Sequence, residues 1–571
     1  MQPSAAIRES ARRRRKLDQT YTEKFSSAWP RRNTRGARVL LIAYILVNAA
    51  LYSVLLPLWE GFDEPFHFAY VQQLANGQGL PDARTARLSR EVGASLLLAP
   101  ASQAVQQNLP QATSYNEYFA WPIAKRLETR QHLWAIPAEF RWQPSDFLNY
   151  EAQHPPLAYL VLAIPERLLV RVPIPLRVAI LRIIAAVAGS LLLLAGAERL
   201  LIQLQVTDPY KAIALFCLFS SQMLWATIAH VGNDWLALPV VVWTLVALNL
   251  LDASPNARSA AIAAAALAGG LLTKAYFLAF VPLLLGLCLC RRRWREAAIA
   301  LLVLCTLAGT WYARNLVQYG VLTGTQEARS GIGLLAVLRD APTVNWPFVI
   351  WSSVRNAVWT GNNTFMTFSA NTLTLLVGTT LVAMLLWVAS RHTKSEKIVL
   401  CYCSLFALAL GYATVVSHIV TRGVGHGPMS WHSQVLLTPL LALAALGASR
   451  WPRLGRFVGV LLVLEFGYVL AATYIVKLIP LYGGYHVHTS LARMATIYVP
   501  SAGLAADLET VTLAPAAVIF TLTGAVILLV GAQQFVLIRS AISQKSFPQE
   551  LRDDAEGGQG QTGPTPKRAR L

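Results

Sequence analysis

VLLIAYILVNAALYSVLLPL (residues 39–58), followed directly by WEGFDEPFHF (residues 59–68), sets the fold of this chain. Wound into a helix that rises about 1.5 Å per residue, the apolar block matches a hydrocarbon layer roughly 30 Å thick. The adjacent carboxylates Asp63 and Glu64 and the histidine His67 follow shortly after the block ends. The stretch therefore predicts a membrane-spanning helix that delivers ionisable side chains to one membrane surface.

Similar apolar blocks recur along the chain and define its class. Hydrophobic residues make up 55% of the 571 residues and charged residues only 14%, whereas soluble domains carry about 25% charged residues. This composition excludes a water-soluble enzyme and a disordered chain. We predict an all-α polytopic membrane protein with about twelve transmembrane helices. Besides 39–58, the predicted spans are 178–200, 211–229, 235–251, 259–273, 276–290, 297–312, 373–390, 398–419, 434–449, 457–475 and 515–537.

The positive charge of the chain, +20 overall, lies largely where a membrane protein needs it to fix its orientation. Residues 1–38 hold eleven basic and three acidic residues, so we expect a cytoplasmic tail. If the chain starts inside, and if 259–290 is split into two spans near Lys274, further basic clusters also fall inside. These clusters are 291–295, 391–394 and 450–453. Because the charge follows the topology, we predict no binding to nucleic acid.

The same parity places three long segments on the outside, where a site is commonly built on a rigid scaffold. They are 59–177, 313–372 and 476–514. Within the first of them, the apolar stretch 156–172 contains Pro165, Glu166 and Arg167. We therefore expect a juxtamembrane helix that lies on the outer interface and does not cross the membrane.

Asp63, Glu64 and His67 form the sharpest polar signal in the chain. Pro65 is compatible with the first turn of a helix, so Asp63 or Glu64 is expected to cap a helix that carries His67 one turn later. An ordinary capped interfacial helix is one interpretation. It accounts for one carboxylate, but not for two carboxylates and a histidine, and all three are therefore candidate site residues.

Further polar side chains fall at the outer ends of predicted spans. They are Tyr150 and His154 in the string NYEAQHPP (149–156), Asp234 between the third and fourth spans, Lys274 between the fifth and sixth, and Arg314 at the start of the second long loop. Each has a plain alternative, since a double proline often starts a helix and a charged side chain can anchor at an interface. Under the predicted topology all of them share one face of the membrane, and this convergence predicts a site.

Together these motifs resemble those of the GT-C superfamily, integral-membrane glycosyltransferases that use a polyprenyl-phosphate sugar. Its members include the protein O-mannosyltransferases and the lipid A aminoarabinose transferases. The Asp-Glu-Pro-x-His-Phe version is most similar to that of a related bacterial membrane-protein family. The resemblance covers roughly residues 39–320 and rests on Asp63-Glu64-x-x-His67, Gly77, His154-Pro155-Pro156-Leu157, Asp234 and Leu272-Thr273-Lys274. Where related sequences often carry an Arg-Tyr pair near a late span, this chain has Gly427-Pro428-Met429-Ser430-Trp431-His432.

The resemblance implies a GT-C-like fold and roles for the candidate residues. It makes Asp63, Glu64 and Asp234 the catalytic candidates, with Asp63 as base or as positioner of the acceptor. It makes His67, Tyr150, His154, Lys274 and Arg314 the substrate-binding candidates, with Lys274 and Arg314 facing the lipid phosphate. The expected organisation is a cytoplasmic tail (1–38), a catalytic transmembrane module (39–320), a C-terminal transmembrane region (321–538) and a disordered cytoplasmic tail (539–571).

The residue types fit that chemistry on their own account. A carboxylate can take the proton of an acceptor hydroxyl as it attacks C1 of the sugar, an effect typically worth about 10²–10⁴-fold. Lysine or arginine beside the leaving phosphate stabilises the negative charge that it gains. The sequence contains no GxxxxGK[ST] and no GxGxxG after a strand, which favours a lipid-linked donor. Asp63, Glu64 and Asp234 also offer oxygen ligands for Mg²⁺ or Mn²⁺, and a metal is left open.

We therefore predict an inverting glycosyltransferase that moves a sugar from a polyprenyl-phosphate donor to an acceptor hydroxyl. We expect it in the bacterial cytoplasmic (inner) membrane, acting at the extracytoplasmic face, with both termini in the cytoplasm. Its partners would be the donor, membrane lipids, and a glycan, lipid or protein acceptor. The alternative is a transporter or flippase of a lipid-linked or anionic substrate, which would place ionisable residues near the bilayer midplane. A non-enzymatic scaffold would leave the Asp-Glu-x-x-His cluster without a purpose.

Overall fold

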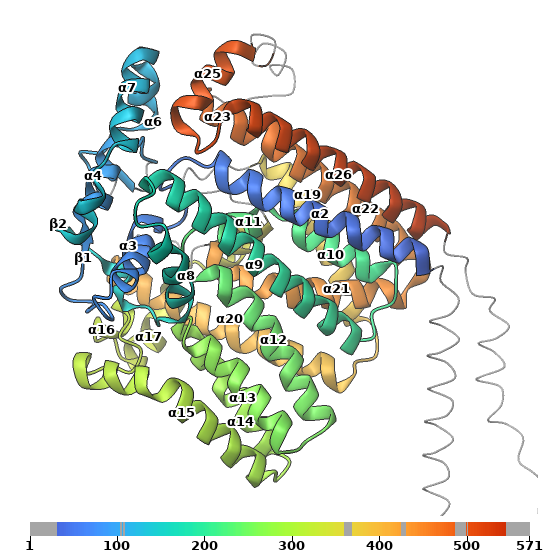
Figure 1. Cartoon of the computed structure of the whole chain (residues 1–571). Coiled ribbons are helices and arrows are strands. Elements are labelled where there is room, and N and C mark those ends of the chain that lie inside the picture. The colour runs from blue at the N-terminus through green and yellow to red at the C-terminus, as the bar shows by residue number, and fades with distance from the viewer. Residues whose placement is uncertain are drawn as a thin grey trace, which may run out of the picture.

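The computed structural model describes most of the chain, and its described part is almost entirely helical (Figure 1). The described residues are 31–102, 105–106, 109–358, 368–423, 430–485, 498 and 501–543. The expectations for most of the N-terminal tail and for residues 544–571 of the C-terminal tail lie outside these residues, whereas residues 539–543, predicted to be disordered, form the end of helix α26 (Ala516–Ser543). Gly427, Pro428 and Met429 of the Gly427–His432 string lie outside them as well.

The predicted apolar segments all coincide with helices. Within the described residues, nine helices are long and apolar enough to cross a membrane. A tenth span is broken, because α10 and α11 bend by 59° at a short break. Two shorter apolar segments, α13 and η3 with α14, complete the twelve. The bounds are α2 (Arg31–Leu55), α9 (Ile174–Gln203), α10 (Tyr210–Ser220), α11 (Gln222–Ile228), α12 (Asp234–Ala253), α13 (Ala257–Leu271), η3 (Ala275–Phe280), α14 (Val281–Leu289), α15 (Trp294–Tyr319), α19 (Ala370–Val388), α20 (Lys394–Val420), η5 (Ser430–Leu436), α21 (Leu437–Arg450), α22 (Pro452–Ala472), η6 (Thr473–Leu478) and α26 (Ala516–Ser543).

The break between α13 and η3 confirms that the stretch 259–290 is two segments. Helix α13 ends at Leu271, and the chain then runs extended through Lys274 before the next helical turn. Gly270 makes this turn possible, because a Cβ there would lie 2.2 Å from the ring of Phe277. The ring thus packs directly on the helix backbone, and Lys274 is left at the end of the bundle.

The spans pack into one bundle around a core of buried aliphatic and aromatic side chains. Helix α2 packs between α9 and α26, and α9 continues the layer through α12, α13 and α15. The later helices α19, α21 and α22 close the other side and contact α10 and α26. In Figure 1 the long helices run in the same general direction across the picture, so their ends define two faces of the bundle.

The remaining elements gather at one end of the bundle, called here the loop end (Figure 1). They are α3 (Glu64–Ala75), β1 (Arg87–Ser89), α4 (Arg90–Leu98), α6 (Tyr115–Ala120), α7 (Ile123–Trp134), η1 (Ala138–Trp142), β2 (Pro144–Leu148), η2 (Tyr150–Gln153), α8 (Leu157–Leu168), α16 (Gln326–Arg329), α17 (Leu334–Asp340), η4 (Ala341–Thr343), α18 (Trp346–Val358), α23 (Ile479–Tyr482) and α25 (Ser501–Val511). The two short strands pair antiparallel, with Arg87 opposite Leu148.

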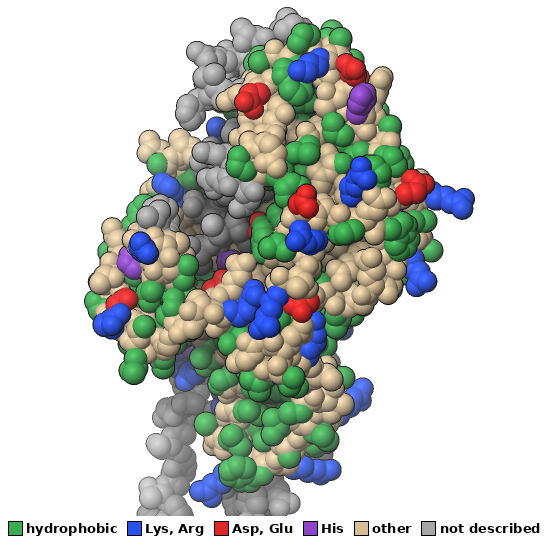
Figure 2. Space-filling model, turned by 90° about the vertical axis from the view of Figure 1, so that its left-hand side faces the viewer, with side chains coloured by type: hydrophobic (Ala, Val, Ile, Leu, Met, Phe, Trp, Pro, Cys, Tyr) green, Lys and Arg blue, Asp and Glu red, His purple; other side chains and the backbone are tan. Residues whose placement is uncertain are grey.

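Hydrogen bonds join the three long segments that the sequence placed on one side. Gln326 donates its backbone N–H to the side chain of Gln153 at 2.7 Å, and Arg126 pairs with Asp507 at 2.8 Å. Helix α8 packs against α3 and is not among the helices that could span a membrane, as predicted for the juxtamembrane segment. Figure 2 looks onto this end, where basic and acidic side chains are interspersed.

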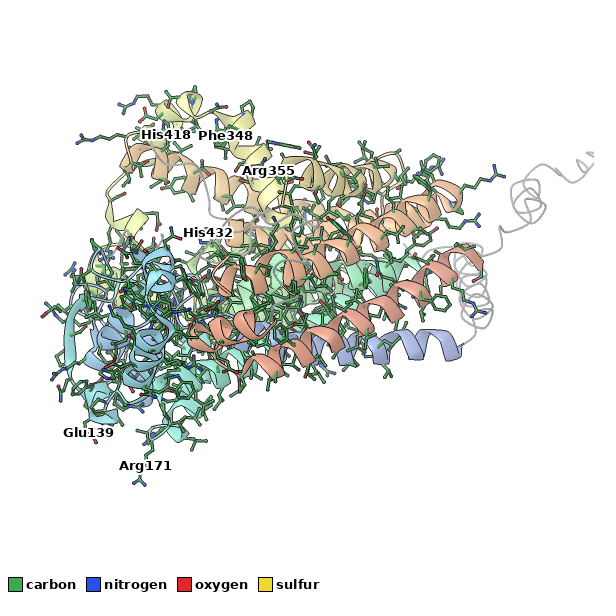
Figure 3. All side chains as sticks on the ribbon, turned by 90° about the horizontal axis from the view of Figure 1, so that it is seen from above. Glu139, Arg171, Phe348, Arg355, His418 and His432 are labelled. Carbon is green, nitrogen blue, oxygen red and sulfur yellow. The ribbon has the colours of Figure 1, made fainter. Side chains whose placement is uncertain are left out.

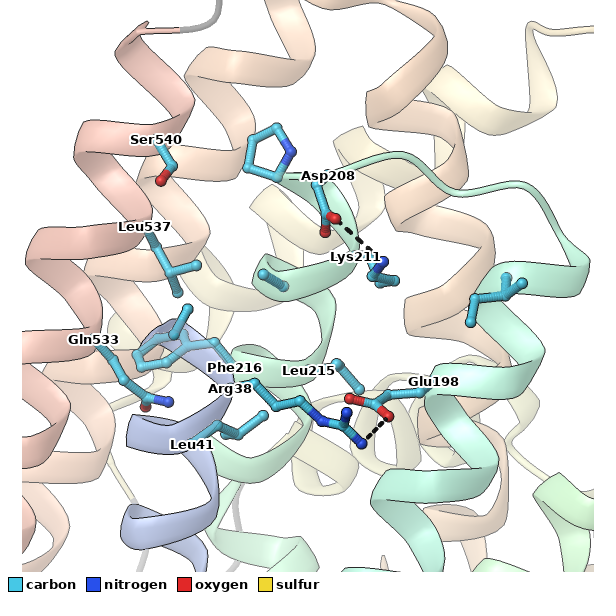
Figure 4. A pocket seen from close by; sticks show the side chains of 14 residues that line it. Arg38, Leu41, Glu198, Asp208, Lys211, Leu215, Phe216, Gln533, Leu537 and Ser540 are labelled. Carbon is cyan, nitrogen blue, oxygen red and sulfur yellow. Dashed lines mark hydrogen bonds and ion pairs between the residues drawn. The ribbon is translucent and has the colours of Figure 1, made fainter. Parts of the chain in front are cut away.

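The opposite end of the bundle carries the basic clusters predicted to share one side. Arg38 pairs with Glu198 at 2.9 Å and Arg450 with Glu396 at 2.7 Å. A cavity of about 300 Å³ lies between α2, α9, α10 and α26 at this end (Figure 4). Because the motif residues belong to the loop end, this cavity is no part of the site they form.

Candidate functional site

Asp63 is the first site residue along the chain. It lies in the connection between α2 and α3, directly before α3 begins. It occupies the cap position of α3 with a left-handed backbone (φ 51°), but its side chain makes no capping bond. Its Oδ1 instead accepts a hydrogen bond from the hydroxyl of Tyr150 at 2.6 Å. The predicted capping role is therefore wrong, and the strained backbone aims the carboxylate away from the helix.

An acid and two histidines lie next to Asp63. Glu151 contacts His154 Nε2 at 2.7 Å and His67 Nδ1 at 3.5 Å, and His67 also shares a 2.8 Å hydrogen bond with the Tyr159 hydroxyl. Burial, together with the charge of Glu151, raises the pKa of Asp63 to about 6. Burial also lowers the pKa of His67 to about 3, so this imidazole is neutral near pH 7. With its pKa raised to about 6, the Asp63 carboxylate can bind or release a proton near that pH.

Lys274 and Asp234 form an ion pair beside this cluster. Nζ of Lys274 lies 2.6 Å from Oδ1 of Asp234, and both side chains are almost fully buried. Lys274 also acts electrostatically on Asp63 and Glu151. The N–H of Leu157 donates to the Leu272 carbonyl at 2.9 Å, which ties the double-proline motif to the Lys274 turn. Motifs far apart in the sequence therefore meet at one place, as the sequence predicted.

Glu64 is engaged in a structural contact. It is fully buried, accepts a 2.8 Å hydrogen bond from Nε of Arg182 in α9, and also accepts the backbone N–H of Val231. Arg182 in turn donates to the carbonyls of Ser53, Leu56 and Pro57, which are left without helical partners at the end of α2. This geometry favours a positioning role for Glu64 over the catalytic role predicted for it.

Arg314 lies in a neighbouring contact. It donates to the Pro81 carbonyl at 3.0 Å and its guanidinium lies 5.1 Å from the centre of the Trp311 ring. Within the described residues, no hydrogen bond or ion pair joins Arg314 to Asp63 or Lys274. Tyr70 lies between Arg314 and the Asp63 cluster. The charge of Arg314 acts on its hydroxyl, and this hydroxyl donates a hydrogen bond to the His154 carbonyl.

The loop before α12 completes the wall of the site. Gly61 allows this loop to approach, since a Cβ there would lie 2.5 Å from Cβ of His230. His230 and Asn233 are buried, and their side-chain polar atoms have no partner among the described residues. The outer ring nitrogen of His154, Nδ1, is unpartnered as well. Buried polar atoms are rarely left unpaired, so this wall offers hydrogen bonds to a ligand.

The three carboxylates proposed as metal ligands do not converge. Glu64 is bound by Arg182 and Asp234 by Lys274, which leaves only Asp63 without a cationic partner. Within the described part of the chain, no group of three histidine, cysteine or acidic residues could hold a metal ion. We therefore derive no step through Mg²⁺ or Mn²⁺.

Sequence reasoning missed three members of the site. Glu151 stands in the quoted NYEAQHPP string, but nothing in the string showed that it would meet His67 from another segment. Arg182 lies inside the apolar block 178–200, and a charged side chain within a predicted span was the feature that could have marked it as a site residue. His432 is the last residue of the string that departs from related sequences, and it interacts electrostatically with Asp234 and Lys274. In Figure 3 it lies where the loop end meets the helices.

Comparisons with known proteins give a structural likeness. No protein-family model matches the chain, and no curated protein matches it. Its structure is similar to the crystal structure of ArnT from Cupriavidus metallidurans bound to undecaprenyl phosphate. The two share 13% sequence identity with a TM-score of 0.44, over 88% of this chain and 78% of ArnT. Since both values are low, we base the proposed function on the chain's own residues.

Proposed function

We propose that the protein is a membrane glycosyltransferase that moves a sugar from a polyprenyl-phosphate donor to an acceptor hydroxyl at the loop end. The observation that carries the proposal is the position of Asp63, a carboxylate with a raised pKa that is bound to Tyr150 and lies within the electrostatic influence of Lys274. A base and a cation at one site are what displacement of a sugar from a phosphate requires.

In the proposed reaction Asp63 is the base. The acceptor oxygen forms a bond to C1 of the sugar while Asp63 takes the proton of its hydroxyl. The bond between C1 and the phosphate oxygen breaks, and its electron pair leaves with the polyprenyl phosphate. A single displacement of this kind inverts the configuration at C1. Tyr150 holds the carboxylate in place by its 2.6 Å hydrogen bond.

Lys274 is proposed to receive the leaving phosphate. Its ion pair with Asp234 places the ammonium at the loop end and keeps it there before the donor binds. The phosphate gains charge as the C1–O bond breaks, and a nearby ammonium in a water-poor site stabilises that charge strongly. Asp234 is then a positioning residue, and His154 and His230 offer nitrogens for the sugar or the phosphate.

The placement of charge supports surface chemistry over transport. The Asp63 and Lys274 groups lie at the ends of helices, next to the layer of loops, whereas transporters place such groups near the bilayer midplane. The opposite end carries the paired basic residues Arg38 and Arg450, and positive charge favours the cytoplasmic side. We propose that the loop end faces outward from the bacterial inner membrane and that both termini are cytoplasmic.

Asp63→Asn tests the proposal, because asparagine keeps the shape and removes the base. The assay incubates purified protein with undecaprenyl-phosphate hexose or pentose and cell-envelope extract, and measures released undecaprenyl phosphate. We expect release to fall by about 10²–10⁴-fold. Asp340→Asn is the matched control, since Asp340 lies at the same end but pairs with the exposed Arg339 on the surface of α17. Equal release by wild type and Asp63→Asn would remove Asp63 from the mechanism.

A further inference from the structure

A second cavity, of about 360 Å³, opens in the layer at the loop end. It lies between the C-terminal half of α3, strand β1 and the turn that joins η1 to β2. Five of its 15 lining residues carry side-chain amides, and the proposed reaction uses none of them. The residues that define this amide cleft are Gln72, Gln73, Asn76, Gln78, Gln143 and Trp142.

Three of the amides, those of Gln143, Gln72 and Gln78, keep hydrogen-bonding atoms for a ligand. Both ends of the Asn76 amide bond to Arg141, and Gln73 donates to the Gly79 carbonyl. Gln143 accepts from Arg90 through Oε1 and Gln72 donates to Glu91 through Nε2, and each keeps the other end of its amide. Gln78 is exposed and has no side-chain partner among the described residues. A carboxamide both donates and accepts hydrogen bonds, as a sugar hydroxyl does. The cleft therefore matches a ligand rich in hydroxyl groups.

The charged groups of the cleft are already paired within the protein. Arg141 donates to Asn76 at 2.9 Å and contacts Glu166, and Arg87 donates to the Asp146 carbonyl at 2.9 Å. Asp82 accepts the N–H of Arg84 and the amide of Gln318. Arg141 is balanced by Glu166, and the charge of Arg87, which carbonyl contacts do not neutralise, is opposed by Asp82 in the same wall. The cleft is therefore close to neutral, and a neutral ligand fits it better than a phosphate.

Trp142 gives the cleft an apolar platform. Its side chain is 52% exposed although it is a large aromatic residue. It stands next to the amides, with the guanidinium of Arg141 5.6 Å from its ring centre. An exposed indole face beside hydrogen-bonding groups suits the C–H face of a sugar ring, because it buries apolar area at a fixed geometry.

Two elements run from this cleft to Asp63. Helix α3 begins directly after Asp63 and carries Gln72 and Asn76, which lie about 14 Å and about 20 Å further along at 1.5 Å per residue. Strand β2 starts at Pro144 in the cleft wall and leads to Tyr150, the partner of Asp63. The cleft and the reacting carboxylate are thus held at a fixed separation by the same layer.

We propose that the amide cleft binds the glycan part of the acceptor. A chain of several sugars would rest in the cleft while its reacting hydroxyl reaches Asp63. This inference rests on the proposed function, because only a transferase has an acceptor. It identifies the acceptor as a molecule that contains a glycan, and not as a lipid without sugars or an unmodified protein. Binding in the cleft itself requires no catalysis.

Glycan binding by the full-length protein tests the inference directly. Purified, fluorescently labelled protein in detergent is applied to an array of bacterial surface oligosaccharides. We expect wild type and Asp63→Asn to retain the same glycans, and Trp142→Ala and Gln78→Ala to lose roughly tenfold in binding. Trp294→Ala is the matched control, because Trp294 is 66% exposed at the start of α15, away from the cleft.

The outcomes separate the cleft from the reaction. Failure of wild type to retain any glycan, or equal binding by wild type and Trp142→Ala, would overturn the cleft assignment. If the cleft variants lose binding but Asp63→Asn still releases undecaprenyl phosphate at the wild-type rate, the cleft stands and the proposed reaction fails.

Discussion

Asp63 carries the chemistry at the scale of single residues, and its raised pKa has a kinetic consequence. A general base acts only in its ionised form, so the rate should rise as Asp63 loses its proton. With a pKa of about 6, kcat/KM should increase about tenfold per pH unit below pH 6 and level off above it. The measurement is the pH–rate profile of the wild-type protein from about pH 4.5 to about pH 8, a range that includes the pKa of Asp63.

Tyr150→Phe sharpens that test, because it removes the hydroxyl that donates to Asp63 without removing the ring. Since that hydrogen bond lowers the pKa of Asp63, its loss should move the bend in the profile to higher pH. A profile flat from pH 5 to pH 8 in both proteins would contradict a role for Asp63 as base.

Residues at boundaries could be predicted from the sequence, and their partners could not. Asp63 and Lys274 stand where apolar blocks end, which is visible in one sequence. The role of Glu64 depends on Arg182, which lies 118 positions away, and no local pattern reports such a pairing. Asp63 itself failed the capping prediction because the hydroxyl of Tyr150, 87 positions away, competes for its carboxylate.

At the scale of elements, the Glu64–Arg182 pair joins α3, α9 and the end of α2. Both side chains are fully buried, and removing one partner of a buried pair typically costs about 3–5 kcal/mol. We therefore expect Glu64→Gln to lower the thermal unfolding temperature of the purified protein markedly. Glu198→Gln is the matched control, because its partner Arg38 is 60% exposed and such pairs contribute about 0–1 kcal/mol.

The unfolding temperature and the activity of Glu64→Gln together distinguish a positioning role of Glu64 from a catalytic role. Glu64→Gln protein that unfolds at the wild-type temperature but releases no undecaprenyl phosphate would return Glu64 to the catalytic group. A lowered unfolding temperature, with activity retained in the protein that remains folded, supports its role as the anchor of α3.

Hydropathy predicted the elements well where length and composition decide them. The single spans such as α2 and α9 follow from long apolar runs that match the membrane. The bend between α10 and α11 was not predicted, because the polar residues Ser220, Ser221 and Gln222 at the break form too short an interruption to end the apolar block 211–229. The split before Lys274 was predicted from the charge of the next loop, and the packing of Phe277 on Gly270 gives its physical cause.

At the scale of the whole molecule, the account requires the two ends of the bundle to face different compartments. A reporter enzyme fused after Asn149 should read extracytoplasmic, and one fused after Lys394 should read cytoplasmic. The basic residues at the end opposite the loops favour this orientation. If both reporters lay on one side of the membrane, the predicted number of spans between Asn149 and Lys394 would be wrong. If the two readings were exchanged, the loop end would lie in the cytoplasm.

The most direct test of the central claim is an experimental structure of the protein with undecaprenyl phosphate bound. We predict density for the phosphate against Lys274 on the loop end, within reach of Asp63, with the isoprenoid chain running between helices. Phosphate density at the opposite end, for example in the cavity beside Arg38 and Lys211, or a loop end that binds no lipid phosphate, would contradict the account.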